Sequence, residues 1–163
     1  MSFPKDYSQV GLRFQVDLRG LSSYAQRGCI EFAQALSKVG FSVIPLKREG
    51  EKLRPVILWQ KFQEKPMKVE EIPKYFRNAQ GIAVVTGKVS GCLVFDVDFP
   101  ERFEKFYPVE RLKKESGMVV KTKDVAHFHA YFLFDEAFKS SKSFLDCFGF
   151  ELKSNGGLST IWS

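Results

Sequence analysis

Two aspartates one residue apart close an apolar stretch, Cys92-Leu-Val-Phe-Asp-Val-Asp98. Because side chains alternate between the two faces of a strand, we expect Asp96 and Asp98 on one face, with Cα atoms about 6.5 Å apart. Two such carboxylates repel each other unless a cation, a proton or a basic group lies between them. Hard divalent cations such as Mg²⁺ or Mn²⁺ prefer oxygen ligands, so the pair predicts a metal site. The alternative is a strand end that becomes polar where it meets solvent.

The only two histidines, His127 and His129, share a face of another predicted strand by the same period of two. Glu151 stands between two apolar residues, where a carboxylate facing the core is costly without a cation. Carboxylates can hold two divalent ions that align a nucleotide's phosphates with an attacking 3′-hydroxyl. A histidine on an adjacent strand can hydrogen-bond a β- or γ-phosphate, and Lys121 and Lys123 add positive charge upstream. An ordinary surface histidine pair and a solvent-facing glutamate are the alternatives.

Length and composition predict one folded domain over residues 1–163. The chain is 44% hydrophobic and 15% aromatic, which is enough to bury a core and argues against disorder. A formal net charge of +6 suits a polyanionic partner such as nucleic acid. Three widely spaced cysteines form neither a zinc pattern nor a disulfide framework, which indicates a reducing compartment. The sequence shows neither a signal peptide nor an apolar run long enough for a membrane span, so we expect a cytoplasmic location.

Hydrophobic periodicity places the secondary structure. Residues 1–20 predict a short strand or an arm, and a helix follows from an N-cap at Ser22 or Ser23, with Gln26 as capping-box partner, to a stop at Gly40. Further helices are expected over residues 69–76, over 101–116 with an interruption near Pro108, and as a short helix within residues 135–147. The expected strands cover residues 41–46, 81–87, 92–98, 118–122, 127–134, 149–153 and 158–162.

Short turns between consecutive strands predict two hairpins. Residues 81–87 and 92–98 are separated by four residues, and 149–153 and 158–162 flank the glycine turn Asn155-Gly-Gly157. This order of hairpins and helices predicts an α+β fold with a mainly antiparallel or mixed sheet.

A basic stretch, residues 47–55, predicts a loop. Its cations are able to meet phosphates, although a solvated turn explains each of them equally well; these cations are Lys47, Arg48, Lys52 and Arg54.

From Gly40 to the end, the chain resembles the primase-polymerase domain of the archaeo-eukaryotic primase superfamily, in the form found in bifunctional replication proteins of plasmids, viruses and phage. The matching text is Gly40-Phe-Ser-Val-Ile-Pro-Leu46, Lys52 with Pro55 and Trp59, Gly81-Ile-Ala-Val-Val-Thr-Gly87, Ser90-Gly-Cys-Leu-Val-Phe-Asp-Val-Asp98, Val120-Lys-Thr122, His129-Ala-Tyr-Phe132 and Phe150-Glu-Leu-Lys-Ser-Asn-Gly-Gly157. The resemblance implies an RRM-like sheet flanked by helices, with an N-terminal α/β part beside it.

The resemblance also implies an activity: template-directed nucleotidyl transfer from nucleoside triphosphates on a DNA template and primer, using Mg²⁺ or Mn²⁺. Asp96 and Asp98 match the first motif and Glu151 the third, so the resemblance makes these three the metal ligands. His129 matches the second motif and would contact the nucleotide's phosphates, with Lys121 and His127 nearby. Thr86 and Gly87 would line the nucleotide pocket.

The chain departs from the family pattern at two places. His127 stands where relatives often carry small residues before the motif histidine, which either replaces a hydroxyl contact to phosphate or changes nucleotide preference. The usual Pro-Pro-Ser ending is replaced by Ile161-Trp162-Ser163, where relatives continue into a helical segment and often a helicase. We therefore expect either a piece of a longer protein or a minimal protein that relies on a replication partner.

Three other functions compete with this one. The pair His127-Phe-His129 also resembles the metal motif of rolling-circle replication nucleases, but the only tyrosine after it is Tyr131, in the same strand. A non-catalytic module that binds single-stranded nucleic acid also fits the net charge and the aromatic content. A catalytically inactive primase relative that retains the sheet as a regulator is the third.

Overall fold

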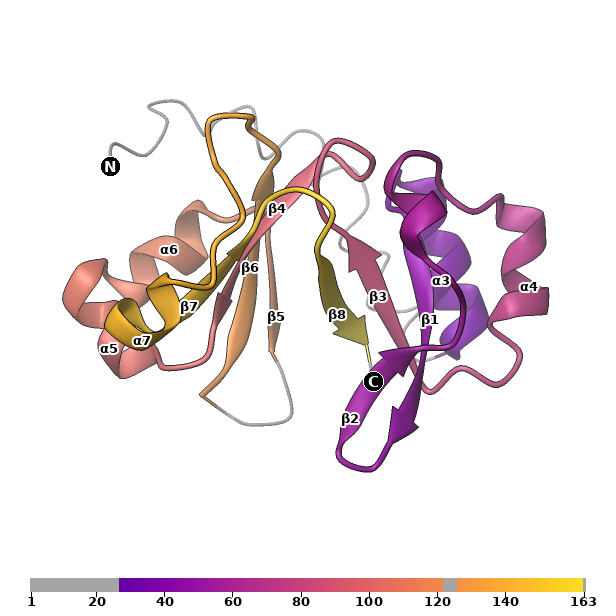
Figure 1. Cartoon of the computed structure of the whole chain (residues 1–163), viewed down its shortest axis with the longest axis horizontal. Helices are drawn as coiled ribbons and strands as arrows, with labels where there is room; N and C mark the ends of the chain where they lie inside the picture. Colours follow the sequence, from indigo (N-terminus) through magenta and orange to yellow (C-terminus); the bar gives the residue numbers. More distant parts are fainter. Residues whose placement is uncertain (1–26, 122–125, 163) are drawn as a thin grey trace.

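The computed structural model describes residues 27–121 and 126–162, which form two four-stranded antiparallel sheets with helices on their outer sides (Figure 1). The first sheet has the order β2-β1-β3-β8 and contains β2 (Lys52–Pro55), β1 (Val43–Glu49), β3 (Gly81–Val85) and β8 (Leu158–Trp162). The second sheet has the order β5-β6-β4-β7 and contains β5 (Met118–Lys121), β6 (Phe128–Leu133), β4 (Cys92–Val97) and β7 (Phe150–Lys153). The α+β class with antiparallel sheets is confirmed, and the RRM-like form of the sheet stays a prediction.

The helices divide between the two sheets. Beside the first sheet lie α3 (Cys29–Lys38), the 3₁₀ helices η1 (Gln60–Gln63) and η2 (Val69–Glu71), and α4 (Ile72–Tyr75). Beside the second lie α5 (Pro100–Phe106), α6 (Val109–Glu115) and α7 (Phe144–Phe148). The predicted interruption of residues 101–116 near Pro108 is confirmed, because that residue stands between α5 and α6. No helix of the described part of the chain is long and apolar enough to cross a bilayer.

The alternation of side chains gives the second sheet two different faces. One face carries Phe95 and Phe150, which pack with α5, α6 and α7 in a core of their own. The ring of Phe150 lies 5.2 Å from that of Phe103 and 5.2 Å from that of Phe144, centroid to centroid. The other face carries Val94 and belongs to the core of the first sheet and α3. The second sheet is therefore covered on both sides, by helices and by the first sheet.

The predicted helix is confirmed from Cys29 onward as α3, with a buried stripe at Phe32, Ala33, Ala35 and Leu36 that packs on the first sheet, whereas residues 27 and 28, which the prediction included, are not helical. It begins after Gly28, and Gly40, in the left-handed region at φ 104°, ends the segment as predicted. The predicted cap at Ser22 or Ser23 with Gln26, and the arm over residues 1–20, lie outside the described residues.

The prediction of a loop over residues 47–55 is wrong. Strands β1 and β2 continue as a hairpin in which Arg48 pairs with Leu53 and Glu49 with Lys52. Gly50, at φ 61°, makes the turn. The many charges indicate a loop in the sequence, but here they are the exposed residues of two strands, while Leu53 packs against the main core.

Both predicted hairpins are wrong as well. Strands β3 and β4 meet only at the isolated bridge between Gly87 and Cys92, after which β4 enters the other sheet. Strands β7 and β8 likewise belong to different sheets. The short glycine turns allow a hairpin locally, but the chain uses them to cross from one sheet to the other.

The two crossings are bonded to each other. The backbone N–H of Thr86 donates to the carbonyl of Gly157 at 2.8 Å, and that of Gly156 donates to the carbonyl of Thr86 at 2.9 Å. Gly87 has φ 111°, and a Cβ there would lie 2.3 Å from Asn155 Oδ1, so the close approach requires glycine. The junction of the sheets is thus a second region of backbone pairing.

Candidate active site

The polar face of the second sheet is organised around Asp96 on β4, one of its two inner strands. In the antiparallel register, Asp96 lies opposite His129 of β6 and opposite Glu151 of β7. Directly opposed residues project from the same face of a sheet, and this face turns toward the first sheet. We call Asp96, His129 and Glu151 the carboxylate row. The sequence predicts that these three residues act together, and the register places them side by side.

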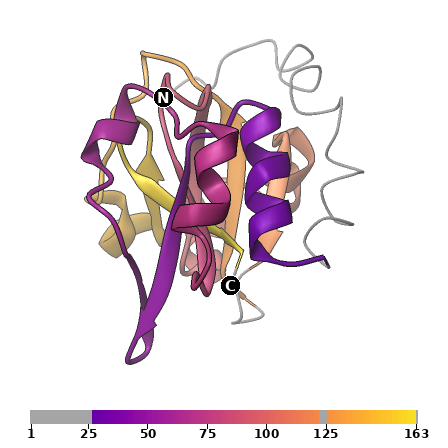
Figure 2. The ribbon, with the colours of Figure 1, turned by 90° about the vertical axis from the view of Figure 1, so that its right-hand side faces the viewer.

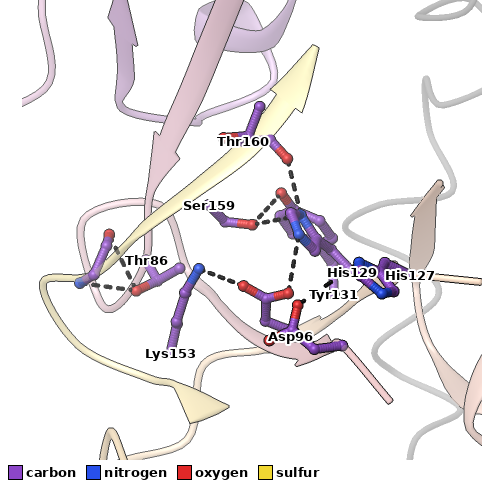
Figure 3. A network of polar contacts seen from close by, with 10 residues as sticks. Thr86, Asp96, His127, His129, Tyr131, Lys153, Ser159 and Thr160 are labelled. Carbon is purple, nitrogen blue, oxygen red and sulfur yellow. Dashed lines mark hydrogen bonds and ion pairs between the residues drawn. The ribbon is translucent and has the colours of Figure 1, made fainter. Parts of the chain in front are cut away.

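Asp96 accepts hydrogen bonds from two basic side chains. His129 Nε2 lies 3.1 Å from one carboxylate oxygen, and Lys153 Nζ lies 2.5 Å from the other (Figure 3). The side chains of Asp96 and His129 are only 13% and 8% exposed. Burial alone would raise the pKa of Asp96, but the hydrogen bond and charge of His129, followed by those of Lys153, hold it well below its usual range. Asp96 is therefore a buried, ionised carboxylate.

The first sheet orients His129. Its Nδ1 lies 2.9 Å from the carbonyl oxygen of Thr160 and 3.1 Å from Ser159 Oγ, both on β8. The hydroxyl of Tyr131, which is completely buried, lies 2.8 Å from the same Ser159 oxygen (Figure 3). A carbonyl oxygen only accepts hydrogen bonds, so Nδ1 must carry a proton to bond Thr160. The histidine is held between the two sheets, with one ring nitrogen on each.

Asp98 and His127 stand just beyond the ends of β4 and β6. His127 Nδ1 lies 4.0 Å from an oxygen of Asp98, and both side chains are about one-third exposed, at 36% and 35%. The backbone N–H of Asp98 donates to the carbonyl of Gly149 at 3.0 Å. Burial, and after it the neighbouring charge of Asp96, raise the pKa of Asp98, so its ionised form is less favourable in the folded protein.

The chemistry of the donor set fits a hard divalent cation. Asp96, Asp98 and Glu151 offer oxygen ligands from one face of one sheet, and the repulsion felt by Asp98 is the kind that a bound cation relieves. Within residues 27–121 and 126–162, no three His, Cys, Asp or Glu side chains converge as a metal-binding group. In this structure Lys153 Nζ bonds one oxygen of Asp96.

The other predicted residues lie outside the carboxylate row. Thr86 is completely buried, and its hydroxyl accepts from the N–H of Gly157 at 3.1 Å, so it serves the junction of the sheets together with Gly87. Lys121 pairs with Phe128, which belongs to the core on the helix side, so the register turns Lys121 to the opposite face from the row. The predicted cations of residues 47–55 stand on the β1–β2 hairpin, and all four are exposed.

Sequence reasoning missed Lys153, Ser159, Tyr131 and Thr160 as members of the site. Lys153 could have been predicted, because it lies two residues after Glu151 and therefore shares its face of the strand. Ser159 and Thr160 could not have been predicted in this way, because the predicted hairpin places them beside β7 rather than across from β6.

Comparison with known families gives a match over most of the chain. A family model described as "Bifunctional DNA primase/polymerase, N-terminal" matches residues 33–162. The chain belongs to this family. Comparison with curated proteins gives no match. Membership in the primase/polymerase family implies nucleotidyl transfer of the DNA primase/polymerase type, with DNA and nucleotides as substrates.

The two aspartates should affect stability in opposite directions in metal-free buffer at pH 7. Asp96→Asn removes an ion pair, and we expect a loss of about 1.5–3 kcal/mol in the free energy of unfolding, the usual range for hydrogen bonds to charged groups. Asp98→Asn removes a repelled charge and should raise this free energy. Urea unfolding in EDTA measures both.

The pH dependence separates the two aspartates further. Because the pKa of Asp96 is lower in the folded state, its stabilisation is present above about pH 4, the unfolded value, and is lost as the pH falls below it. The pKa of Asp98 shifts in the opposite direction. Asp98→Asn should therefore make the free energy of unfolding fall more steeply as the pH is lowered, and Asp96→Asn should make it fall less steeply. An Asp96→Asn protein as stable as the wild type at both pH 7 and pH 3 would contradict this account.

The proton on His129 Nδ1 can be observed directly, since the chain has only two histidines. We expect ¹⁵N-histidine NMR to show a protonated Nδ1 for His129, with the signal assigned by its persistence in His127→Gln. Ser159→Ala should shift this resonance without removing the proton, because the Thr160 carbonyl remains. A bare Nδ1 in the wild-type protein would show that β8 does not hold the ring as described.

Proposed function

We propose that this chain carries out template-directed nucleotidyl transfer at the carboxylate row, as a DNA primase, a DNA polymerase or both. The observation that carries the proposal is the position of Asp96: it is mostly buried and ionised, and it lies on β4 between His129 and Glu151, within a chain of the primase/polymerase family. A buried charge is costly to maintain, so its presence supports a functional role.

Asp96, Asp98 and Glu151 are the residues that would hold Mg²⁺ or Mn²⁺. A bound divalent ion would supply neutralisation of phosphate charge and activation of the 3′-hydroxyl. Glu151 is half-buried and faces the same side as Asp96, and Asp98 stands at the more open end of the strand. The row therefore offers one protected ligand beside two more accessible ones.

His129 and Lys153 would provide positive charge for the triphosphate. Without nucleotide, both side chains bond Asp96. Lys153 has a long flexible stem, so its ammonium group can exchange the carboxylate for a phosphate oxygen. His129 is fixed through Nδ1 on β8, so only its Nε2 is directed at the row. To contact a phosphate, Nε2 would have to share its hydrogen bond with Asp96 or give it up. His127, more exposed beside Asp98, is a further contact for phosphate.

The competing functions have less support. Tyr131 is completely buried and bonded to Ser159, and burial raises its pKa, so it is poorly suited to attack DNA as a nuclease nucleophile. A base-stacking module needs exposed aromatic rings on its sheet, whereas Phe95, Phe132 and Phe150 pack in the core under α5–α7. A helicase or another replication partner stays a prediction.

Primer extension tests the proposed function. On a labelled primer–template with Mg²⁺ or Mn²⁺, we expect extension by the wild-type protein and a loss of about 100-fold or more for Asp96→Asn, because losing a metal ligand removes several kcal/mol of transition-state stabilisation. The matched control is Asp146→Asn, the same change at an exposed position of α7, which should extend normally. Extension by a folded Asp96→Asn protein at the wild-type rate would overturn the proposal.

A further inference from the structure

The β1–β2 hairpin and the segment after it form an exposed ribbon, residues 47–58. The hairpin projects beyond the rest of the first sheet, as the violet arm of Figure 2 shows. From Lys52 to Gln60 every second residue is exposed, while the residues between them are half-buried. A chain with this alternation presents one regular row of side chains to solvent.

Register sorts the hairpin's cations onto two faces. Lys47 pairs with Arg54 and Glu49 with Lys52, so these four side chains share one face. Arg48 pairs with Leu53, so its side chain is on the other face. Its backbone N–H donates to Gln80 Oε1. The face of Lys47, Lys52 and Arg54 therefore carries three cations and one carboxylate, and its net charge is positive.

The cationic face of the hairpin is on the side of the first sheet that faces the carboxylate row. Continuing the register, Lys47 shares its face with Val43, Val43 pairs with Val84, and Val84 pairs with Ser159. Ser159 points at His129, with 3.1 Å between its hydroxyl and the ring nitrogen. A strand bound along the cations would thus lie on the same side of the first sheet as the site.

After the cations, the ribbon continues with exposed apolar side chains. Val56 is 47% exposed and Leu58 is 84% exposed, and they are two of only four large hydrophobic residues exposed in the described part of the chain. The N–H of Val56 donates to the carbonyl of Pro45 at 3.2 Å, so Val56 extends the pairing by one step on the face of Arg54. Positive charge is followed along the chain by aliphatic surface.

We propose that this ribbon binds single-stranded DNA that leads to the carboxylate row, an inference that deepens the proposed function and rests on it for the role of the DNA. Lys47, Lys52 and Arg54 contact phosphates, and Val56 and Leu58 contact the bases. Charge selects a polyanion, and the apolar pair selects a strand whose bases are unpaired and free to contact it. The pair of Glu49 and Arg54, 3.4 Å apart, is exposed on both sides and weak, so a phosphate can take Arg54 from it.

Fluorescence anisotropy of a labelled oligothymidylate in EDTA tests the ribbon without nucleotide or catalysis. For Lys47→Ala/Lys52→Ala/Arg54→Ala we expect at least about a tenfold loss of affinity, and a salt slope of log K smaller by about 2, since each phosphate contact on a single strand contributes about 0.7. The matched control is Lys38→Ala/Lys74→Ala, exposed cations of α3 and α4 beside the other face of the first sheet, which should leave the slope near the wild-type value.

Two single changes test the chemistry of the ribbon. Glu49→Gln should tighten binding, because it removes the one negative charge on the cationic face. Leu58→Ser should weaken binding without changing the salt slope. All variants are compared by thermal unfolding, so that loss of fold is recognised.

The outcomes separate the two proposals. A triple variant with wild-type affinity and salt slope, or a wild-type protein that does not bind the oligonucleotide, would overturn the proposal that the ribbon binds DNA. Either result is what we would expect if this surface bound a protein partner instead. Failed extension by the wild-type protein, together with intact ribbon binding, would count against the proposed function alone. Lost ribbon binding in the triple variant, with the control intact, supports the ribbon.

Discussion

The structure depends on how one buried charge is compensated. Asp96 lies on an inner strand of the second sheet, where an ionised carboxylate is tolerated only if cations and hydrogen bonds replace the lost water. His129 and Lys153 provide them from the two neighbouring strands, β6 and β7. The strand order β6-β4-β7 is thus also the arrangement that makes this charge possible, and any change that separates these strands leaves it unpaired.

The compensation extends to the first sheet. Nε2 of His129 is directed at Asp96 because the other ring nitrogen is held by Thr160 and Ser159 of β8. Strand β8 is positioned in turn by the paired crossings: the N–H of Thr86 donates to the carbonyl of Gly157, its carbonyl accepts from the N–H of Gly156, and its hydroxyl accepts from the N–H of Gly157. The residues that join the sheets, Thr86 and Gly87 among them, therefore also help to set the orientation of the histidine.

Much of the site could be predicted from local pattern. Period-two alternation placed Asp96 with Asp98, and His127 with His129, on common faces, and apolar runs gave every strand of the second sheet. The partners of those strands could not be predicted in the same way. The turn between β3 and β4 can make either a hairpin or a crossing between sheets. Which one forms depends on the apolar side chains against which each strand packs. Those side chains lie far away in sequence, such as Phe41 and Tyr131 in the shared core.

Charge misled the prediction in both directions. Residues 47–55 resemble a loop because four cations stand close together, yet an exposed hairpin needs only one inward position in two, and Leu53 supplies it. A lysine at an alternating strand position usually faces solvent, whereas the side chain of Lys153 is only 17% exposed and its ammonium group bonds Asp96. A residue type alone does not distinguish a solvated charge from a compensating one; the facing strand does.

We propose that Asp96, Asp98 and Glu151 hold divalent metal, and binding of Mn²⁺ followed by electron paramagnetic resonance tests this most directly. The account predicts saturable binding by the wild-type protein, loss of that binding in Asp96→Asn, and wild-type binding in Asp146→Asn. Equal Mn²⁺ binding by the wild type and a folded Asp96→Asn protein would contradict it, because the buried carboxylate would then have no part in holding the ion.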